Sequence, residues 1–325
     1  MIIKNLLQAT ALAAALCTAA ASTQAATYPD RPLRLLVGYA PGGPVDTTAR
    51  VFAKYLGDKL GQTVVVENRA GASGMIASDA TAKATPDGYL LGFAASPSLT
   101  ISPLVQKSKL FDPHQDFTPI GMVVDYTNVL LIGPQNPAKS VAELLEYAKA
   151  HPDAVSFGSA GVGASNHLSA ELLKLQAKAP MLHVPYRGNS PAMMDVVSGK
   201  ITFMFDITST AIPFIKSGQA RALAVTSRTR NPELPDVPTM IEAGMKDYEV
   251  VGWYALMAPP KLPDDIKTRL DKALNDVKED PAFRKAMVKG GYTVDEGDGQ
   301  AVQSRIDREY AMWDEVIKSA NIQSN

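Results

Sequence analysis

The stretch Leu35-Leu-Val-Gly-Tyr-Ala-Pro-Gly-Gly-Pro-Val-Asp46 predicts how this chain folds. The stretch begins within a short apolar run, residues 33–39, that is typical of a strand buried on both faces. The run breaks at Pro41-Gly-Gly-Pro44, and a helical pattern with an apolar stripe follows over residues 49–60. A strand, a glycine-rich turn and a helix start together aim backbone N–H groups at an anion. A plain strand-to-helix connection has the same sequence pattern and remains the alternative.

The same arrangement recurs at Val155-Ser-Phe-Gly-Ser-Ala-Gly-Val-Gly-Ala-Ser-Asn-His-Leu168, where a Gly/Ser-rich turn joins a strand to a helix. Before it, the apolar runs at 63–67 and 89–94 flank a helical segment at 75–84. This alternation predicts half of a doubly wound α/β sheet. Ligands bind beyond the carboxyl ends of the strands in such sheets. Gly42, Gly43 and the hydroxyl-rich loop 95–100, with Ser96 and Ser98, are expected at that edge.

The pattern changes near residue 118 and predicts a second lobe. Residues 119–124 and 128–133 are expected to be two strands separated by Asp125-Tyr-Thr, and to form the first crossing between lobes. Residues 250–258 are expected to form the return crossing. We expect three C-terminal helices, at about 264–279, 281–289 and 298–320, to pack on the first lobe.

Two glycine-rich helix starts, one on each lobe, predict a ligand cleft between two doubly wound α/β lobes. Two crossing segments would allow the lobes to close on the ligand. The predicted division is a signal peptide at 1–25, a first lobe at 26–126 and 252–325, and a second lobe at 127–251.

The amino terminus has the pattern of a secretory signal peptide. One early charge, Lys4, precedes an Ala-rich apolar stretch that ends in small residues near Ala25. The stretch is too short for a permanent membrane span. A lipoprotein anchor at Cys17 is the alternative, but Leu16 precedes it where a small residue is needed. Cleavage near Ala25 would leave a chain without cysteine, exported to the periplasm, which excludes disulfide scaffolds and thiol chemistry.

The composition indicates an ordinary globular protein. The chain has 325 residues, with 32 Lys and Arg against 33 Asp and Glu, and 46% hydrophobic residues. A chain with such balanced charge has no basic face for nucleic acid. We expect a monomer.

Enzyme motifs are incomplete in this sequence. Ser159 lies in Phe157-Gly-Ser-Ala-Gly161, which lacks the first glycine of a nucleophile elbow. Gly161-Val-Gly163 opens a dinucleotide-like fingerprint, but Asn166 replaces the third glycine and a clear acidic partner is missing. The four histidines are too scattered for a zinc site. We therefore expect neither catalysis nor a cofactor or metal.

Each candidate ligand-binding residue also has a structural interpretation. Asp46 and Asp206 could cap helices, His167 could pack in a first turn, and the loop residue Arg187 could clamp a carboxylate or remain solvated. Aromatic residues at strand ends could either wall the pocket or pack between lobes. The predicted ligand-binding residues are Tyr39, Ala40, Pro41, Gly42, Gly43, Val45, Asp46, Ser96, Ser98, Ser159, Ala160, Gly161, Gly163, Ser165, Asn166, His167, Tyr186 and Asp206.

Several motifs along the chain resemble one family closely. They are Tyr28-Pro-Asp-Arg-Pro32, Ala40-Pro-Gly-Gly-Pro-Val-Asp46, Val66-Glu-Asn-Arg-Ala-Gly-Ala-Ser-Gly74, Pro86-Asp-Gly-Tyr89, Val184-Pro-Tyr-Arg-Gly188, Phe205-Asp206, Arg221-Ala-Leu-Ala-Val-Thr226 and Leu234-Pro-Asp-Val-Pro-Thr239. The chain is similar over its mature length to the Bug proteins, the extracytoplasmic solute receptors of tripartite tricarboxylate transporters.

The resemblance implies a periplasmic-binding-protein-like fold that closes on a carboxylate-bearing solute. It implies that the loop 40–46 holds one carboxylate through backbone groups and ordered water, and that the loop 159–167 and Asp206 complete the ligand site. Pro44 departs from many relatives, which have glycine or a small polar residue there. The implied function is capture of a small carboxylate, aliphatic or aromatic and in particular a dicarboxylate, for a membrane permease. A sensory subunit that docks on a receptor kinase and an exported hydrolase are the alternatives.

Overall fold

The structure is a computed structural model that describes residues 28–106, 110–152, 154–186 and 188–319. The predicted signal peptide and Arg187 lie outside the described residues. In the described part of the chain, ten strands form one curled mixed sheet whose main path runs β2-β1-β3-β9-β4-β7-β5-β6, with β8 and β10 both paired to β4. The strands are β1 Leu33–Val37, β2 Val64–Asn68, β3 Leu90–Ala95, β4 Thr118–Ile132, β5 Ser156–Ser159, β6 Leu182–Pro185, β7 Phe203–Ile207, β8 Arg221–Val225, β9 Val251–Ala258 and β10 Tyr292–Val294.

The first lobe has the predicted parallel unit at its edge. Strand β1 pairs in parallel with β2 and β3, and β9 joins antiparallel to β3. The apolar stripe of α2 packs Phe52 against Phe93 of β3 and Phe283 of α11, in one core. The helices of this part are α2 Pro44–Leu60, α3 Met75–Ala82, α4 Ser96–Thr100, α5 Ser102–Val105, α10 Asp264–Lys278, α11 Pro281–Lys289 and α12 Gly299–Ser319, with a short 3-10 turn, η1, at Ala72–Gly74.

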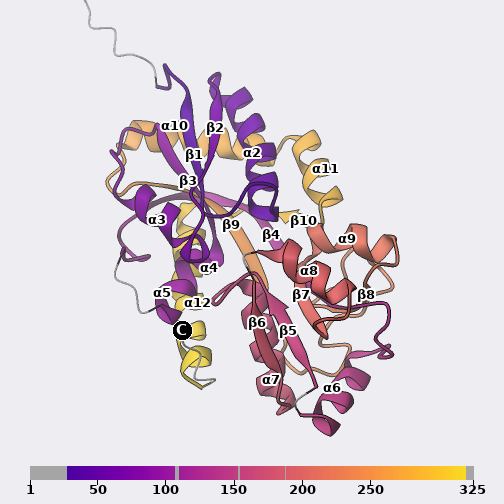
Figure 1. Cartoon of the computed structure of the whole chain (residues 1–325). Coiled ribbons are helices and arrows are strands. Elements are labelled where there is room, and N and C mark those ends of the chain that lie inside the picture. The colour runs from indigo at the N-terminus through magenta and orange to yellow at the C-terminus, as the bar shows by residue number, and fades with distance from the viewer. Residues whose placement is uncertain (1–27, 107–109, 153, 187, 320–325) are drawn as a thin grey trace, which may run out of the picture.

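The second lobe repeats the same construction. Strand β5 pairs in parallel with β6 and β7, and β4 pairs antiparallel to β7 and β8. Its core places Phe157, Phe203 and Phe205 on neighbouring strands. The helices are α6 Val141–Ala150, α7 Ser165–Ala177, α8 Asn189–Val197 and α9 Thr208–Lys216. Both lobes are therefore wound α/β units, as predicted (Figure 1).

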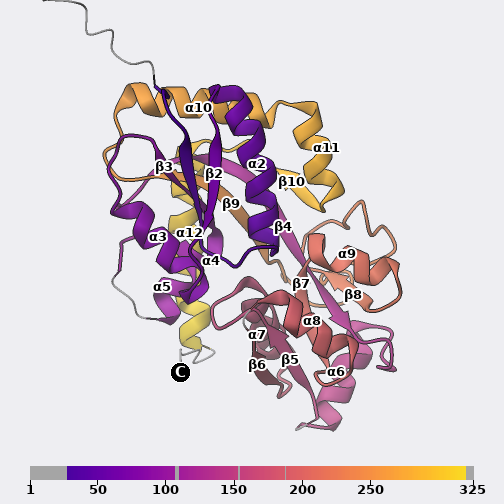
Figure 2. The same ribbon diagram turned by 45° about the horizontal axis from the view of Figure 1, so that its top comes forward.

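The first crossing is one continuous strand, which corrects the prediction of two strands. β4 spans 15 residues, and Asp125, Tyr126 and Thr127 pair with β9 rather than forming a break. Asp125 is accommodated because Arg305 of α12 donates to its carboxylate over 2.7 Å. Pairing with β9 ends at Thr127, and pairing with β7 begins at Asn128. The long strand β4 runs from one lobe into the other (Figure 2). The predicted lobe boundaries remain a proposal.

Two further local predictions were incomplete. The segment expected as a hydroxyl-rich loop at 95–100 forms the short helix α4, because Thr100 donates to Ser96 O and Pro97 occupies the first turn. Strand β10 was not predicted. The three C-terminal helices are confirmed as α10, α11 and α12, and α12 packs along β4, α4 and α5.

Candidate functional site

A cavity of about 760 Å³ lies between the lobes at the ends of their parallel strands. Uncharged side chains and backbone form its wall, and none of the described lining residues is acidic or basic. The lining residues are Gly38, Tyr39, Ala40, Pro41, Gly42, Gly43, Pro44, Val45, Ala70, Gly71, Ala72, Ser73, Ala95, Pro97, Gln106, Tyr126, Ala160, Gly161, Val162, Ala164, Ser165, Asn166, Gly188, Asn189, Ser190, Pro191 and Ile207.

Besides the five-residue α4, four helices in the described part of the chain begin at this cavity: α2 from the first lobe, and α7, α8 and α9 from the second. Their N-cap residues are Gly43, Ala164, Gly188 and Ile207, and none of the four caps its helix through a side chain. Each helix start carries roughly half a positive charge from the aligned peptide dipoles. These helix starts therefore place partial positive charge at the wall with no lining cation among the described residues, and two buried carboxylates lie behind it, Asp46 in the first turn of α2 and Asp206 just before α9.

The first turn of α2 presents free backbone donors. Its first backbone hydrogen bond runs from Thr47 N to Gly43 O, which leaves the N–H groups of Val45 and Asp46 for other partners. Pro44 has no N–H to offer. Gly38, which follows β1, allows the close approach of the loop 70–74, because a Cβ on Gly38 would lie 2.5 Å from Gly74 Cα.

Asp46 supports this loop from behind and does not line the cavity. It is only 2% exposed, and its carboxylate accepts from Gly42 N over 2.9 Å, from Asn68 Nδ2 over 2.8 Å and from Arg50 Nε over 3.0 Å. Burial alone would raise the pKa of Asp46, but these hydrogen bonds outweigh it and lower the pKa. Asp46 is therefore an ionised carboxylate whose hydrogen bond from Gly42 N holds Gly42 in position.

Asn166, like Ser165 before it, is a polar residue of α7 that lines the cavity. Its Oδ1 accepts from Ala160 N over 3.1 Å and from His167 N over 3.0 Å. A flipped amide would set its NH₂ against two N–H donors, so the orientation is fixed. The Nδ2 group is consequently the part of Asn166 available to a ligand.

Ser159 and His167 flank the loop 160–164, which joins β5 to α7, and do not line the cavity. Ser159 Oγ is 2.6 Å from His183 Nε2, a serine–histidine pair that the sequence did not reveal. Ser159 is fully buried, so it has no access to a substrate and supplies no nucleophile. His167 Nδ1 accepts from Gly163 N, and burial together with the neighbouring His183 lowers the pKa of His167 to about 3. His167 is thus a neutral packing residue, as in its structural interpretation.

Asp206 is also buried, at 1% exposure, and does not line the cavity itself but holds a residue that does, Asn189. Its Oδ1 accepts from Asn189 Nδ2 and from Ile207 N, and its Oδ2 accepts from Thr210 Oγ1 over 2.8 Å. Burial raises the pKa of Asp206 to about 6, against the effect of these hydrogen bonds. At neutral pH it is therefore a carboxylate that holds the cavity residue Asn189.

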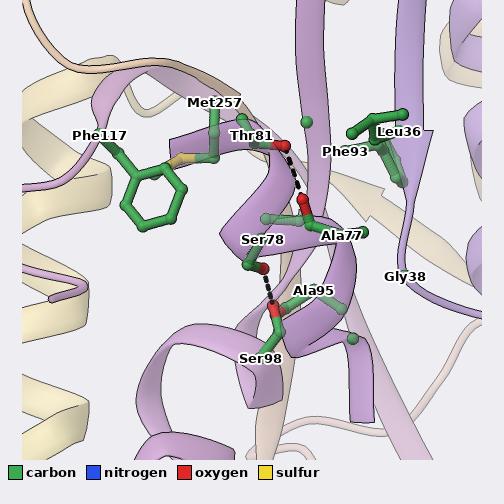
Figure 3. A pocket seen from close by; sticks show the side chains of 13 residues that line it. Leu36, Gly38, Ala77, Ser78, Thr81, Phe93, Ala95, Ser98, Phe117 and Met257 are labelled. Carbon is green, nitrogen blue, oxygen red and sulfur yellow. Dashed lines mark hydrogen bonds between the residues drawn. The ribbon is translucent and has the colours of Figure 1, made fainter. Parts of the chain in front are cut away.

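The remaining predicted residues outside the cavity have other partners. Ser98 lies beside a separate void of about 10 Å³ beneath α3, where it donates to Ala95 O and accepts from Ser78 (Figure 3). Ser96 Oγ accepts from Trp253 N. Tyr186 donates to Asp195 over 2.9 Å.

Ten of the predicted residues do line the cavity: Tyr39, Ala40, Pro41, Gly42, Gly43, Val45, Ala160, Gly161, Ser165 and Asn166. Eight of the seventeen lining residues that were not predicted come from two segments, the loop 70–73 and residues 188–191 at the start of α8. The first bridges the lobes, since Ser73 Oγ donates to Val162 O over 3.0 Å. Four successive positive φ angles, from Gly71 to Gly74, shape this loop. The Gly-Ala-Ser-Gly sequence at 71–74 was the feature from which this unusual loop could have been predicted.

Two wound lobes around an interlobe cavity lined with hydrogen-bond donors define a solute-binding protein. The profile of the tripartite tricarboxylate transporter family receptor matches residues 48–322. The chain therefore belongs to this family of receptors, the Bug proteins, which are solute-binding proteins and not enzymes.

Relatives along the whole chain agree with this assignment. Protein BugT of Bordetella pertussis is 37% identical over 275 residues, 84% of each chain. The solved periplasmic binding protein BugD is 36% identical with a TM-score of 0.85, over 92% of this chain and 100% of that one. Rpa4515 of R. palustris, solved with adipate, is 32% identical with a TM-score of 0.87, over 91% of this chain and 99% of that one. Among the described residues, no helix is both long and apolar enough to cross a membrane.

Proposed function

We propose that this protein captures a small carboxylate, in particular an aliphatic or aromatic dicarboxylate, and presents it to the permease of a tripartite tricarboxylate transporter. The observation that carries the proposal is the convergence of four helix starts, uncapped by side chains, on one cavity. Such starts bind anions through backbone N–H groups and the helix dipole.

The absence of a lining cation among the described residues fits a receptor that must release its ligand. An unpaired buried cation is costly to desolvate, whereas backbone N–H groups carry only partial charge. Closing the lobes excludes water and strengthens these contacts. Adipate in the related R. palustris protein supports a carboxylate as the ligand.

We assign direct contact with the ligand to predicted residues that line the cavity, chiefly the loop 39–45, Ser165 and Asn166. Asp46, Ser159, His167 and Asp206 position those contacts from behind. Ser96, Ser98, Gly163 and Tyr186 have the same indirect role in this proposal.

We further propose that residues 1–25 direct export and are removed, so that a monomer works in the periplasm. The family assignment and the periplasmic relative BugD support this location. Mass spectrometry of the exported chain tests the cleavage, and capture of membrane partners with and without ligand separates delivery to a permease from docking on a receptor kinase.

Thermal unfolding against a panel of mono-, di- and tricarboxylates and their amides tests the ligand class. A ligand at 100 times its dissociation constant stabilises the folded state by about 2.7 kcal/mol. We expect one or more carboxylates to raise the unfolding temperature while the matching amides do not. Stabilisation by amides alone would contradict the proposal.

A further inference from the structure

We propose that the second lobe selects a carboxylate that also carries an O–H or N–H group, and that Asn189 Oδ1 accepts this hydrogen. The inference rests on the proposed function and narrows its ligand class. It depends on the hydrogen bonds that fix two asparagine side chains in the cavity wall, Asn166 and Asn189.

The orientation of the Asn189 amide is set by Asp206. Asn189 Nδ2 donates to Asp206 Oδ1, and a flipped amide would place its oxygen against that carboxylate oxygen. Asp206 is itself fixed, because it also accepts from Ile207 N over 2.8 Å and from Thr210 Oγ1. Asn189 therefore presents its oxygen to the cavity that it lines.

The two amides consequently offer opposite chemistry. Asn166 is held by two backbone donors and presents Nδ2, which donates to a carboxylate. Asn189 Oδ1 has no partner among the described residues and can only accept. A carboxylate oxygen placed against it would be repelled, whereas a hydroxyl or N–H group would satisfy it.

An unmet acceptor penalises ligands that lack the donor. Leaving a cavity oxygen unpaired after water is excluded costs about as much as a hydrogen bond, which corresponds to roughly tenfold in affinity. A subsite that fits a hydroxyl by size alone would give the same ranking, so the comparison with Asn189→Leu, whose side chain has a similar size and no acceptor, separates the two explanations.

The test is isothermal titration calorimetry with two matched series: succinate, malate and 2-methoxysuccinate, and benzoate, 3-hydroxybenzoate and 3-methoxybenzoate. In at least one series we expect the hydroxyl compound to bind about tenfold more tightly than both its parent and its methyl ether. In Asn189→Leu this preference should vanish. Gln176→Leu makes a comparable amide-to-aliphatic change on an exposed part of α7 and should retain it.

The outcomes separate the two proposals. Carboxylates that bind without a preference for the hydroxyl, or with a preference that Asn189→Leu leaves intact, overturn the role of Asn189 and leave the carboxylate receptor standing. Failure of every compound in both series overturns the inference and also counts against the proposed function. The wild-type series tests the preference by itself, and thermal unfolding of unliganded Asn189→Leu checks that the variant folds before a lost preference is assigned to Asn189.

Discussion

At the scale of single residues, Asn166 determines the polarity of the second-lobe wall. Its Oδ1 is occupied by two backbone N–H groups, so a change at Nδ2 alters only the group that meets the ligand. Asn166→Asp keeps the shape and both hydrogen bonds and replaces the donor with a carboxylate oxygen. We expect the affinity for any bound carboxylate to fall at least about tenfold, because like charges would face each other.

Calorimetry with a carboxylate identified by the thermal screen measures this loss. Gln176→Glu adds the same negative charge on an exposed position of α7 and should bind as the wild type does. Unfolding of the unliganded variants checks that both fold. Unchanged affinity in Asn166→Asp would show that the amide does not contact the carboxylate.

At the scale of elements, α7 packs on β5 and β6 through two histidines, the buried His167 and the half-buried His183. The rings of His167 and His183 lie 4.1 Å apart. Burial lowers the pKa of His167 to about 3 and that of His183 to about 4, so both are neutral in the folded protein. The unfolded chain takes up these protons below its own histidine pKa of about 6.5. The contribution of the two neutral histidines to the free energy of unfolding is therefore full above pH 6.5 and is lost as the pH falls toward 4.

We expect His167→Asn to reduce that pH dependence. Its Oδ1 can replace Nδ1 as the acceptor for Gly163 N, and one proton-linked group is removed. Between pH 6.5 and 5, the free energy of unfolding of the wild type should fall by roughly 1.5 kcal/mol relative to the variant. Urea unfolding across this range measures the difference, with His151→Asn as the control for losing an exposed histidine. Parallel wild-type and His167→Asn profiles would contradict the argument.

The same scale explains what could be predicted from the sequence. The strand–turn–helix units were predictable because apolar spacing and Gly-Gly-Pro act locally over about a dozen residues. β4 was divided wrongly because Asp125 is polar, and its partner Arg305 lies 180 residues away. Asn189 and Ser73 escaped prediction for a similar reason, since each reaches the cavity only when its loop docks on distant residues.

At the scale of the whole molecule, the lobes meet through two kinds of contact. The first is covalent: β4 continues from one lobe into the other, so this connection is present in open and closed forms alike. Side-chain hydrogen bonds across the lobes form only when they approach: Ser73 Oγ donates to Val162 O, and Tyr292 Oη lies 2.8 Å from Ser209 Oγ. Ser73 and Val162 both line the cavity, so their hydrogen bond joins the two lobes across its wall.

Ser73→Ala should therefore speed ligand release without weakening the fold. In the open form Ser73 is free to bond water, so the lost hydrogen bond destabilises only the closed, liganded state. One hydrogen bond corresponds to roughly a two- to tenfold faster dissociation, with association little changed. Stopped-flow measurement with a bound carboxylate reports both rates. Ser198→Ala, which removes an exposed serine hydroxyl bond at the end of α8, should leave both rates as in the wild type. Equal dissociation rates in Ser73→Ala and the wild type would mean that the loop 70–73 lines the cavity without holding it closed.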